Sequence, residues 1–146
     1  MRIRTGLLSV LFLGLFGSIS CLAATAIQPG AVWLDNRGKQ IQAHGGGILK
    51  VGDTYFWFGE DRTQGLDPTF RYVACYSSKD LTHWTFRNQV LKLTDPENLG
   101  PGWLIERPKV FYNAKTKKFV MYTHLDNRTY KAARVGIAIS DTVDGD

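Results

Sequence analysis

Two glutamates stand at the ends of strand-like segments, where a side chain can leave a sheet and meet a ligand. Glu60 follows an aromatic run and a glycine, and Glu106 opens a second strand-like run just before Arg107. A carboxylate can accept hydrogen bonds from hydroxyl groups and can stabilise developing positive charge. A neighbouring guanidinium can donate a forked pair of hydrogen bonds to a ligand, or it can orient the carboxylate. These positions are therefore the centre of a candidate chemical site.

The other reactive residue types do not form a recognisable site. The histidines His44, His83 and His124 lack the spacing of a metal-binding motif, so we expect no metal and no cofactor. The glycine run 45–47 is not followed by a helical pattern, which argues against a phosphate-binding loop. Cys75 lies inside an apolar strand pattern, so we expect a buried thiol rather than a nucleophile.

Short β-rich runs separated by turns fill the chain after residue 26, without helical periodicity. We expect one set of strands at 47–51, 54–60 and 71–78, with a fourth beginning at 82, and a second set at 109–113, 118–124 and 133–140. Residues 73–78 align with residues 135–140 without a gap. Repeated antiparallel units of this kind are typical of propeller blades. The alternative is a single sandwich with two similar hairpins.

The first 26 residues have the pattern of a secretory signal. Arg2 and Arg4 precede an uncharged apolar run, and residues 24–26 have the small-x-small form of a cleavage site. We therefore expect a signal peptide over 1–26, a secreted or periplasmic protein, and no membrane partner after the signal is removed. A lipoprotein anchor at Cys21 is the alternative, but Ser18 stands where such anchors have an aliphatic residue.

Charge and composition exclude one class of partner and favour another. The net charge of +5 comes from scattered lysines, of which Lys115, Lys117 and Lys118 share one turn. A nucleic-acid surface needs a longer basic stripe, so we expect no nucleic-acid partner. The aromatic content of 12% suits strands and also suits stacking on sugar rings.

Three stretches resemble glycoside hydrolase family 43. They are Q-A-H-G-G-G-I-L at 42–49 followed by Y-F-W-F-G-E at 55–60, then Y-S-S-K-D-L-T-H-W at 76–84, and E-R-P-K-V at 106–110. Their combination is most similar to the branch that contains exo-β-1,3-galactanases. The resemblance implies an all-β, five-bladed β-propeller, of which residues 27–146 cover blade one and most of blade two. It also implies that the further C-terminal blades of the same protein are the structural partner.

The same resemblance implies a glycosidase that acts on plant-type polysaccharide, most simply an inverting exo-β-1,3-galactanase acting on (arabino)galactan. It implies that Glu106 assists catalysis and that Gln42, Glu60, Arg107 and Tyr130 contact the sugar. The wider family has an aspartate near the position of His44 and another at the position of Lys109. The galactanase branch shares both departures, and it implies that the general acid and base lie beyond residue 146.

Several alternatives accompany this interpretation. Another family 43 specificity, such as arabinofuranosidase or xylosidase, would suit the same blades, and so would a glycan-binding propeller without activity or an inactive fragment. Glu60 could instead be a rim residue paired with Arg62, and Glu106 could be an exposed strand end. Arg107 could neutralise a neighbour, and Gln42 could be a surface residue.

Overall fold

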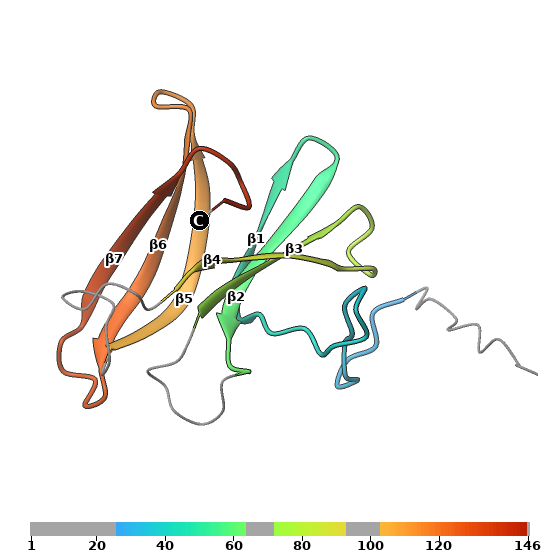
Figure 1. The fold of residues 1–146 in the computed structure, drawn as a ribbon, viewed down its shortest axis with the longest axis horizontal. Helices are drawn as coiled ribbons and strands as arrows, with labels where there is room; N and C mark the ends of the chain where they lie inside the picture. Colours follow the sequence, from blue (N-terminus) through green and yellow to red (C-terminus); the bar gives the residue numbers. More distant parts are fainter. Residues whose placement is uncertain (1–25, 64–71, 93–102, 146) are drawn as a thin grey trace, which may run out of the picture.

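The computed structural model describes residues 26–63, 72–92 and 103–145. Strands β1 (His44–Val51), β2 (Thr54–Asp61), β3 (Tyr72–Ser78) and β4 (Thr85–Leu91) form one antiparallel sheet, paired in chain order. Strands β5 (Trp103–Asn113), β6 (Lys118–Asn127) and β7 (Arg134–Ser140) form a second antiparallel sheet. The two sheets lie side by side, with β1 and β2 against β5 (Figure 1).

Most of the chain's first 26 residues lie outside the described ranges, so the predicted signal peptide stays a prediction. In the part of the chain that the structure describes, no helix is long and apolar enough to cross a membrane.

The two predicted sets of strands are present, but several strand boundaries were wrong. β5 begins at Trp103 instead of Lys109, so Glu106 lies inside a strand and Trp103 is not a loop residue. The polar sequence at 106–108 does not have the alternation of a strand, because β5 contains a bulge at that point. The fourth strand begins at Thr85, since the residues before it form a turn. β6 extends beyond His124 to Asn127.

The core of the described chain is shared between the two sheets. Side chains that alternate along the strands form one buried cluster: Phe58, Val73, Cys75 and Val90 from the first sheet, and Ile105, Met121 and Leu125 from the second. Burial of a large apolar side chain contributes about 1.5–3 kcal/mol, so the contact between the sheets is a main source of stability. Cys75 is fully buried, as predicted, and burial raises the pKa of its thiol to about 12.

Three tryptophans cover the other face of the first sheet. The ring centroids of Trp33, Trp57 and Trp84 lie 5.1 to 6.4 Å apart, in tilted and edge-to-face pairs. Such pairs contribute about 0.5–1.5 kcal/mol beyond their buried area. Trp57 and Trp84 are thus part of the blade core. Trp33 brings the segment before β1 onto this face, where its indole nitrogen donates to the carbonyl oxygen of Thr82 at 3.1 Å.

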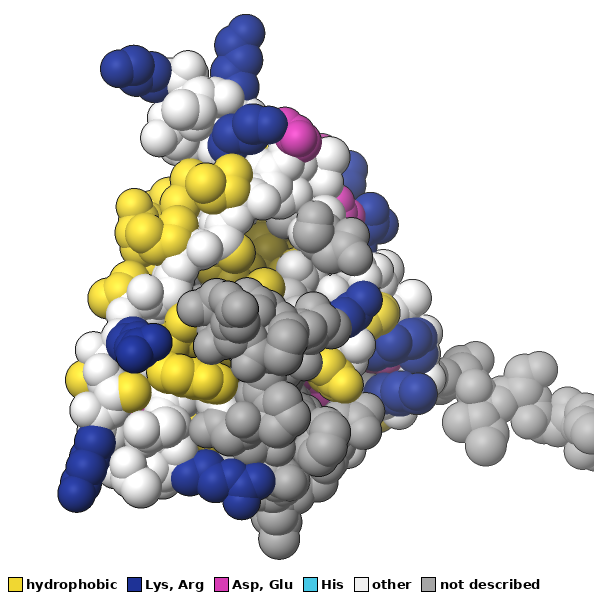
Figure 2. Space-filling view, turned by 60° about the vertical axis from the view of Figure 1, so that its left-hand side comes forward, with side chains coloured by type: hydrophobic (Ala, Val, Ile, Leu, Met, Phe, Trp, Pro, Cys, Tyr) yellow, Lys and Arg dark blue, Asp and Glu magenta, His cyan; other side chains and the backbone are white. Residues whose placement is uncertain are grey.

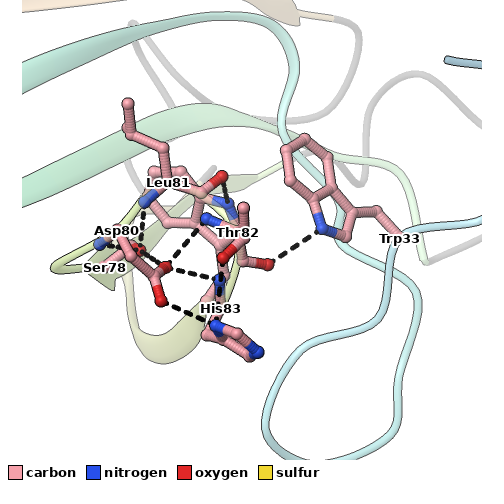
Figure 3. A network of polar contacts seen from close by, with 7 residues as sticks. Trp33, Ser78, Asp80, Leu81, Thr82 and His83 are labelled. Atoms are coloured by element: carbon pink, nitrogen blue, oxygen red, sulfur yellow. Dashed lines mark hydrogen bonds and ion pairs between the residues drawn. The ribbon is translucent and has the colours of Figure 1, made fainter. Parts of the chain in front are cut away.

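That carbonyl belongs to the turn between β3 and β4, which a compact network holds in shape (Figure 3). Asp80 Oδ1 accepts from the backbone amides of Thr82 and His83 at 2.9 and 2.8 Å, and Asp80 Oδ2 lies 2.7 Å from His83 Nδ1. Ser78 Oγ accepts from the amide of Leu81 at 2.9 Å. The His83 amide, the His83 ring and the Thr82 amide hold the pKa of Asp80 well below its ordinary value. The S-S-K-D-L-T-H-W stretch therefore encodes this turn.

The outer face of the second sheet is apolar and exposed. Ile137 and Ile139 on β7 stand opposite Tyr122 and Val120 on β6, and Phe111 on β5 also stands opposite Val120, so all five share one face. Ile137 is 62% exposed and Ile139 is 64% exposed. Figure 2 shows hydrophobic side chains gathered on the side of the molecule where β6 and β7 lie. An exposed apolar face of this kind marks an interaction surface or an aggregation site.

We therefore expect the 146-residue chain to self-associate. Replacing both Ile137 and Ile139 by lysine should lower the apparent mass in size-exclusion chromatography with light scattering, because charge on this face opposes edge and face pairing. Lys115→Glu, in the β5–β6 turn, is the control and should change little. A wild-type chain that stays monomeric at the same concentration would contradict the expectation.

Candidate functional site

The two predicted carboxylates lie in the region where β1 and β2 meet β5, and both are buried. Glu60 lies on β2 and is 1% exposed, and Glu106 lies on β5 and is 6% exposed. The expectation that Glu60 leaves the sheet at the rim is wrong, and so is the alternative of Glu106 as an exposed strand end. A buried carboxylate requires partners that compensate for its lost hydration. The contacts of each one therefore define the site.

Glu60 connects the two sheets. Its Oε1 accepts a hydrogen bond from the backbone amide of Arg107 at 3.2 Å. Its Oε2 accepts from Nε and Nη2 of Arg62 at 3.1 and 2.8 Å, and it lies 3.5 Å from His44 Nδ1. The pairing with Arg62 considered from the sequence is thus present, but in a buried position rather than at an exposed rim.

Glu106 lies beside a bulge in β5. It stands opposite His124 on β6, and the register shifts before Lys109 stands opposite Tyr122. Glu106 Oε1 accepts a hydrogen bond from the hydroxyl of Tyr130 at 2.7 Å, so two predicted site residues are in direct contact. At the bulge Arg107 has a φ of 54° and an exposed side chain. Its amide binds Glu60, a contact that the sequence pattern did not predict.

The glycine run of β1 makes this approach of the sheets feasible. β1 also has a register shift, between His44 and Gly47. A Cβ at Gly45 would lie 3.5 Å from Arg107 Cγ, and a Cβ at Gly47 would lie 3.0 Å from Lys109 Cδ, both on β5 of the other sheet. Within the first sheet, a Cβ at Gly46 would overlap the carbonyl oxygen of Phe58 on β2. The run therefore serves close backbone packing.

Lys109 was noted only as a departure from the wider family, and the structure shows what it does. Its amino group donates to the carbonyl oxygens of Gly45 at 3.0 Å and of Gly46 at 2.8 Å. It also lies 3.4 Å from the carbonyl oxygen of Pro108. Lys109 therefore joins the bulge of β5 to the bulge of β1.

Gln42 lies in the segment just before β1. Its backbone amide donates to the hydroxyl of Tyr76 at 3.0 Å. Gln42 lines an open hollow of about 470 Å³ together with His44 and Arg62, both of which contact Glu60. Two partners of Glu60, His44 and Arg62, thus border a hollow whose walls also include apolar side chains such as Trp33 and Trp57. Glu106 and Tyr130 form a separate pair on the second sheet.

Two residues outside the predicted set, His124 and Asp126, support the loop that carries Tyr130. Asp126 is 1% exposed, and its Oδ2 lies 3.0 Å from His124 Nε2. Burial raises the pKa of Asp126, but the backbone amides of Asn127 and of residues 132 and 133, together with His124, outweigh this and hold it below its ordinary value. The buried side chains of β6 alternate at Met121, Thr123 and Leu125, and Asp126 does not fit this alternation, so no sequence pattern indicated it.

The arrangement of the site can present acceptors to a ligand that carries hydroxyl groups. Buried carboxylates supply acceptors for hydroxyl groups, and Arg62 and Tyr130 fix those carboxylates through charge-assisted hydrogen bonds. In residues 26–63, 72–92 and 103–145, no three His, Cys, Asp or Glu side chains are grouped in a way that could hold a metal ion.

Comparison with protein-family models gave no match, and neither did comparison with curated proteins. Solved structures do match. An exo-β-1,3-galactanase from Phanerochaete chrysosporium, solved with galactose, is 43% identical over 80% of this chain, with a TM-score of 0.76. An exo-β-1,3-galactanase from Clostridium thermocellum is 45% identical over 80% of this chain, with a TM-score of 0.71. A family 43 β-1,3-galactosidase solved with galactodeoxynojirimycin is 44% identical over 80% of this chain, with a TM-score of 0.73.

These matches define the fold first and the family second. The two antiparallel sheets are part of a five-bladed β-propeller, as the neighbours are, and the site lies where the two blades meet. The chain belongs to glycoside hydrolase family 43, in the branch that contains exo-β-1,3-galactanases. It spans 27%, 25% and 35% of the lengths of the three neighbours named above.

The glycine packing leads to a stability prediction. Gly46→Ala should destabilise the protein by about 3 kcal/mol, because the new methyl group overlaps backbone that cannot move without separating β1 from β2. Gly52→Ala is the control: it has open space around it and a φ of 60°, so we expect a cost of only about 1 kcal/mol. Chemical denaturation of both variants measures the difference. Equal midpoints would show that close packing at Gly46 is unimportant.

Proposed function

We propose that the protein is an exo-β-1,3-galactanase, which releases galactose from the ends of β-1,3-linked galactan such as the backbone of arabinogalactan. The observation that carries this proposal is the 43 to 45% identity, over 80% of the chain, to galactanases from two organisms. The Phanerochaete chrysosporium enzyme was solved with galactose, and variants of it were solved with β-1,3-galactotriose. These ligands support a galactose-containing substrate for the proposed enzyme.

Each predicted site residue has a role in this proposal. Glu106 assists catalysis, because a fixed carboxylate accepts sugar hydroxyls and favours positive charge developing on the ring. Glu60, Gln42, Arg107 and Tyr130 contact the sugar. The reaction inverts the anomeric centre, with an acid and a water-positioning group roughly 6.5–9.5 Å apart.

The activity is tested by substituting Glu106 in the full-length product of the gene. Glu106→Gln keeps the size of the side chain but removes its charge, so galactose release from β-1,3-galactan should fall by about 10²–10³-fold. Glu60→Gln should act mainly on KM. Asp53→Asn, an exposed acid in the β1–β2 turn, is the matched control and should leave the rate unchanged.

The outcomes separate the competing functions. Near-normal turnover by Glu106→Gln would remove Glu106 from the catalytic site. Cleavage of arabinan or xylan oligosaccharides with no cleavage of galactan would keep the family and replace the substrate. A wild-type protein that binds galactan without any turnover would be a glycan-binding propeller.

The same proposal includes export. Arg2, Arg4 and the apolar run that follows them support a secreted or periplasmic protein whose mature chain begins at Ile27. Intact-mass measurement of the exported product should give a chain that lacks residues 1–26. Recovery of a soluble cytoplasmic product that retains Met1 would contradict it.

A further inference from the structure

The loop that carries Tyr130 is closed by one buried carboxylate. Asp126 Oδ1 accepts hydrogen bonds from the backbone amides of Asn127 and Ala132, both at 2.9 Å. Within the loop, the amide of Tyr130 donates to the carbonyl oxygen of Asn127 at 3.0 Å. Asp126 therefore binds the start and the end of the segment that presents Tyr130.

The other oxygen of Asp126 reaches Tyr130 by a second route. Asp126 Oδ2 lies 3.0 Å from His124 Nε2. An ionised carboxylate can only accept, so this contact places a hydrogen on Nε2 and orients the imidazole ring. The ring of His124 stacks on the ring of Tyr130, with centroids 6.5 Å apart and planes 14° apart. The Tyr130 hydroxyl then donates to Glu106 Oε1 at 2.7 Å.

Tyr130 depends on these contacts because burial does not hold it. Its side chain is 55% exposed, and its φ of 54° lies in the left-handed region. That conformation costs a non-glycine residue about 1–2 kcal/mol, so the surrounding contacts must compensate for it. Asp126 thus binds the backbone on both sides of Tyr130, and His124 contacts the Tyr130 ring. The Tyr130 hydroxyl in turn contacts Glu106.

We propose that Asp126 and His124 are positioning residues that hold Tyr130 against Glu106 and so fix the Glu106 carboxylate for the sugar. The proposal rests on the proposed glycosidase function for its catalytic consequence. The contacts themselves do not depend on that function. Misplacement of a reacting group by about 1 Å can cost on the order of 100-fold in rate, which makes such support measurable.

The kinetic test uses the full-length product of the gene. His124→Ala removes the stack and should lower kcat/KM on β-1,3-galactan by about 10- to 100-fold. His124→Phe keeps a stacking ring and should recover most of this loss. In a Tyr130→Phe background, His124→Ala should have little further effect, because His124 acts through the Tyr130 hydroxyl. Lys131→Ala, in the same loop, is the control and should leave kcat/KM unchanged.

An activity-independent measurement separates this proposal from the proposed function. Crystal structures of His124→Ala and Asp126→Asn should show the Tyr130 hydroxyl displaced from Glu106, even if the wild-type protein releases no galactose. An absence of galactose release would overturn the substrate, not the positioning role. The positioning role is overturned if the hydroxyl stays within hydrogen-bond distance of Glu106 in whichever variants fold. It is equally overturned if His124→Ala and Tyr130→Phe have additive effects on kcat/KM.

Discussion

The Glu60 carboxylate is almost fully buried, and it accepts hydrogen bonds from both sheets. Burying an unpaired charge costs several kcal/mol, so its bonds to Arg62 on one side and to the amide of Arg107 on the other are required. The amide of Arg107 is available because β5 bulges there and takes a left-handed conformation. The polar link between the blades therefore depends on the bulge in β5.

The remainder of the junction follows from this link. Strands β1 and β5 can approach closely only where β1 has no side chains, and the glycines at 45–47 meet that condition. Lys109 then satisfies the carbonyl oxygens that the β1 bulge exposes. Lys109 is therefore a cation that joins the backbones of the two sheets. Glu60 and Glu106 place negative charge in the same region.

Glu106 receives a different kind of support. Its partner Tyr130 comes from a strained and exposed loop, and the buried Asp126 fixes that loop through backbone amides and through His124. A strand alone cannot place a carboxylate oxygen accurately, because the side chain has several rotamers of similar energy. The second sheet thus supplies both the carboxylate and the neighbours that limit its motion.

The sequence alone determined the β-rich runs, the two repeated sets of strands, the lysine-rich turn between β5 and β6 and the buried Cys75, because alternation and turn chemistry are local. The quoted motifs were also sufficient for the family. Only the tertiary structure decided that Glu106 lies buried inside β5, that Arg107 acts on Glu60 through its amide, and that Asp126 lies behind Tyr130. A bulge reverses which face later residues occupy, and the amide that Glu60 needs lies 47 positions away, so no local pattern could reveal these contacts.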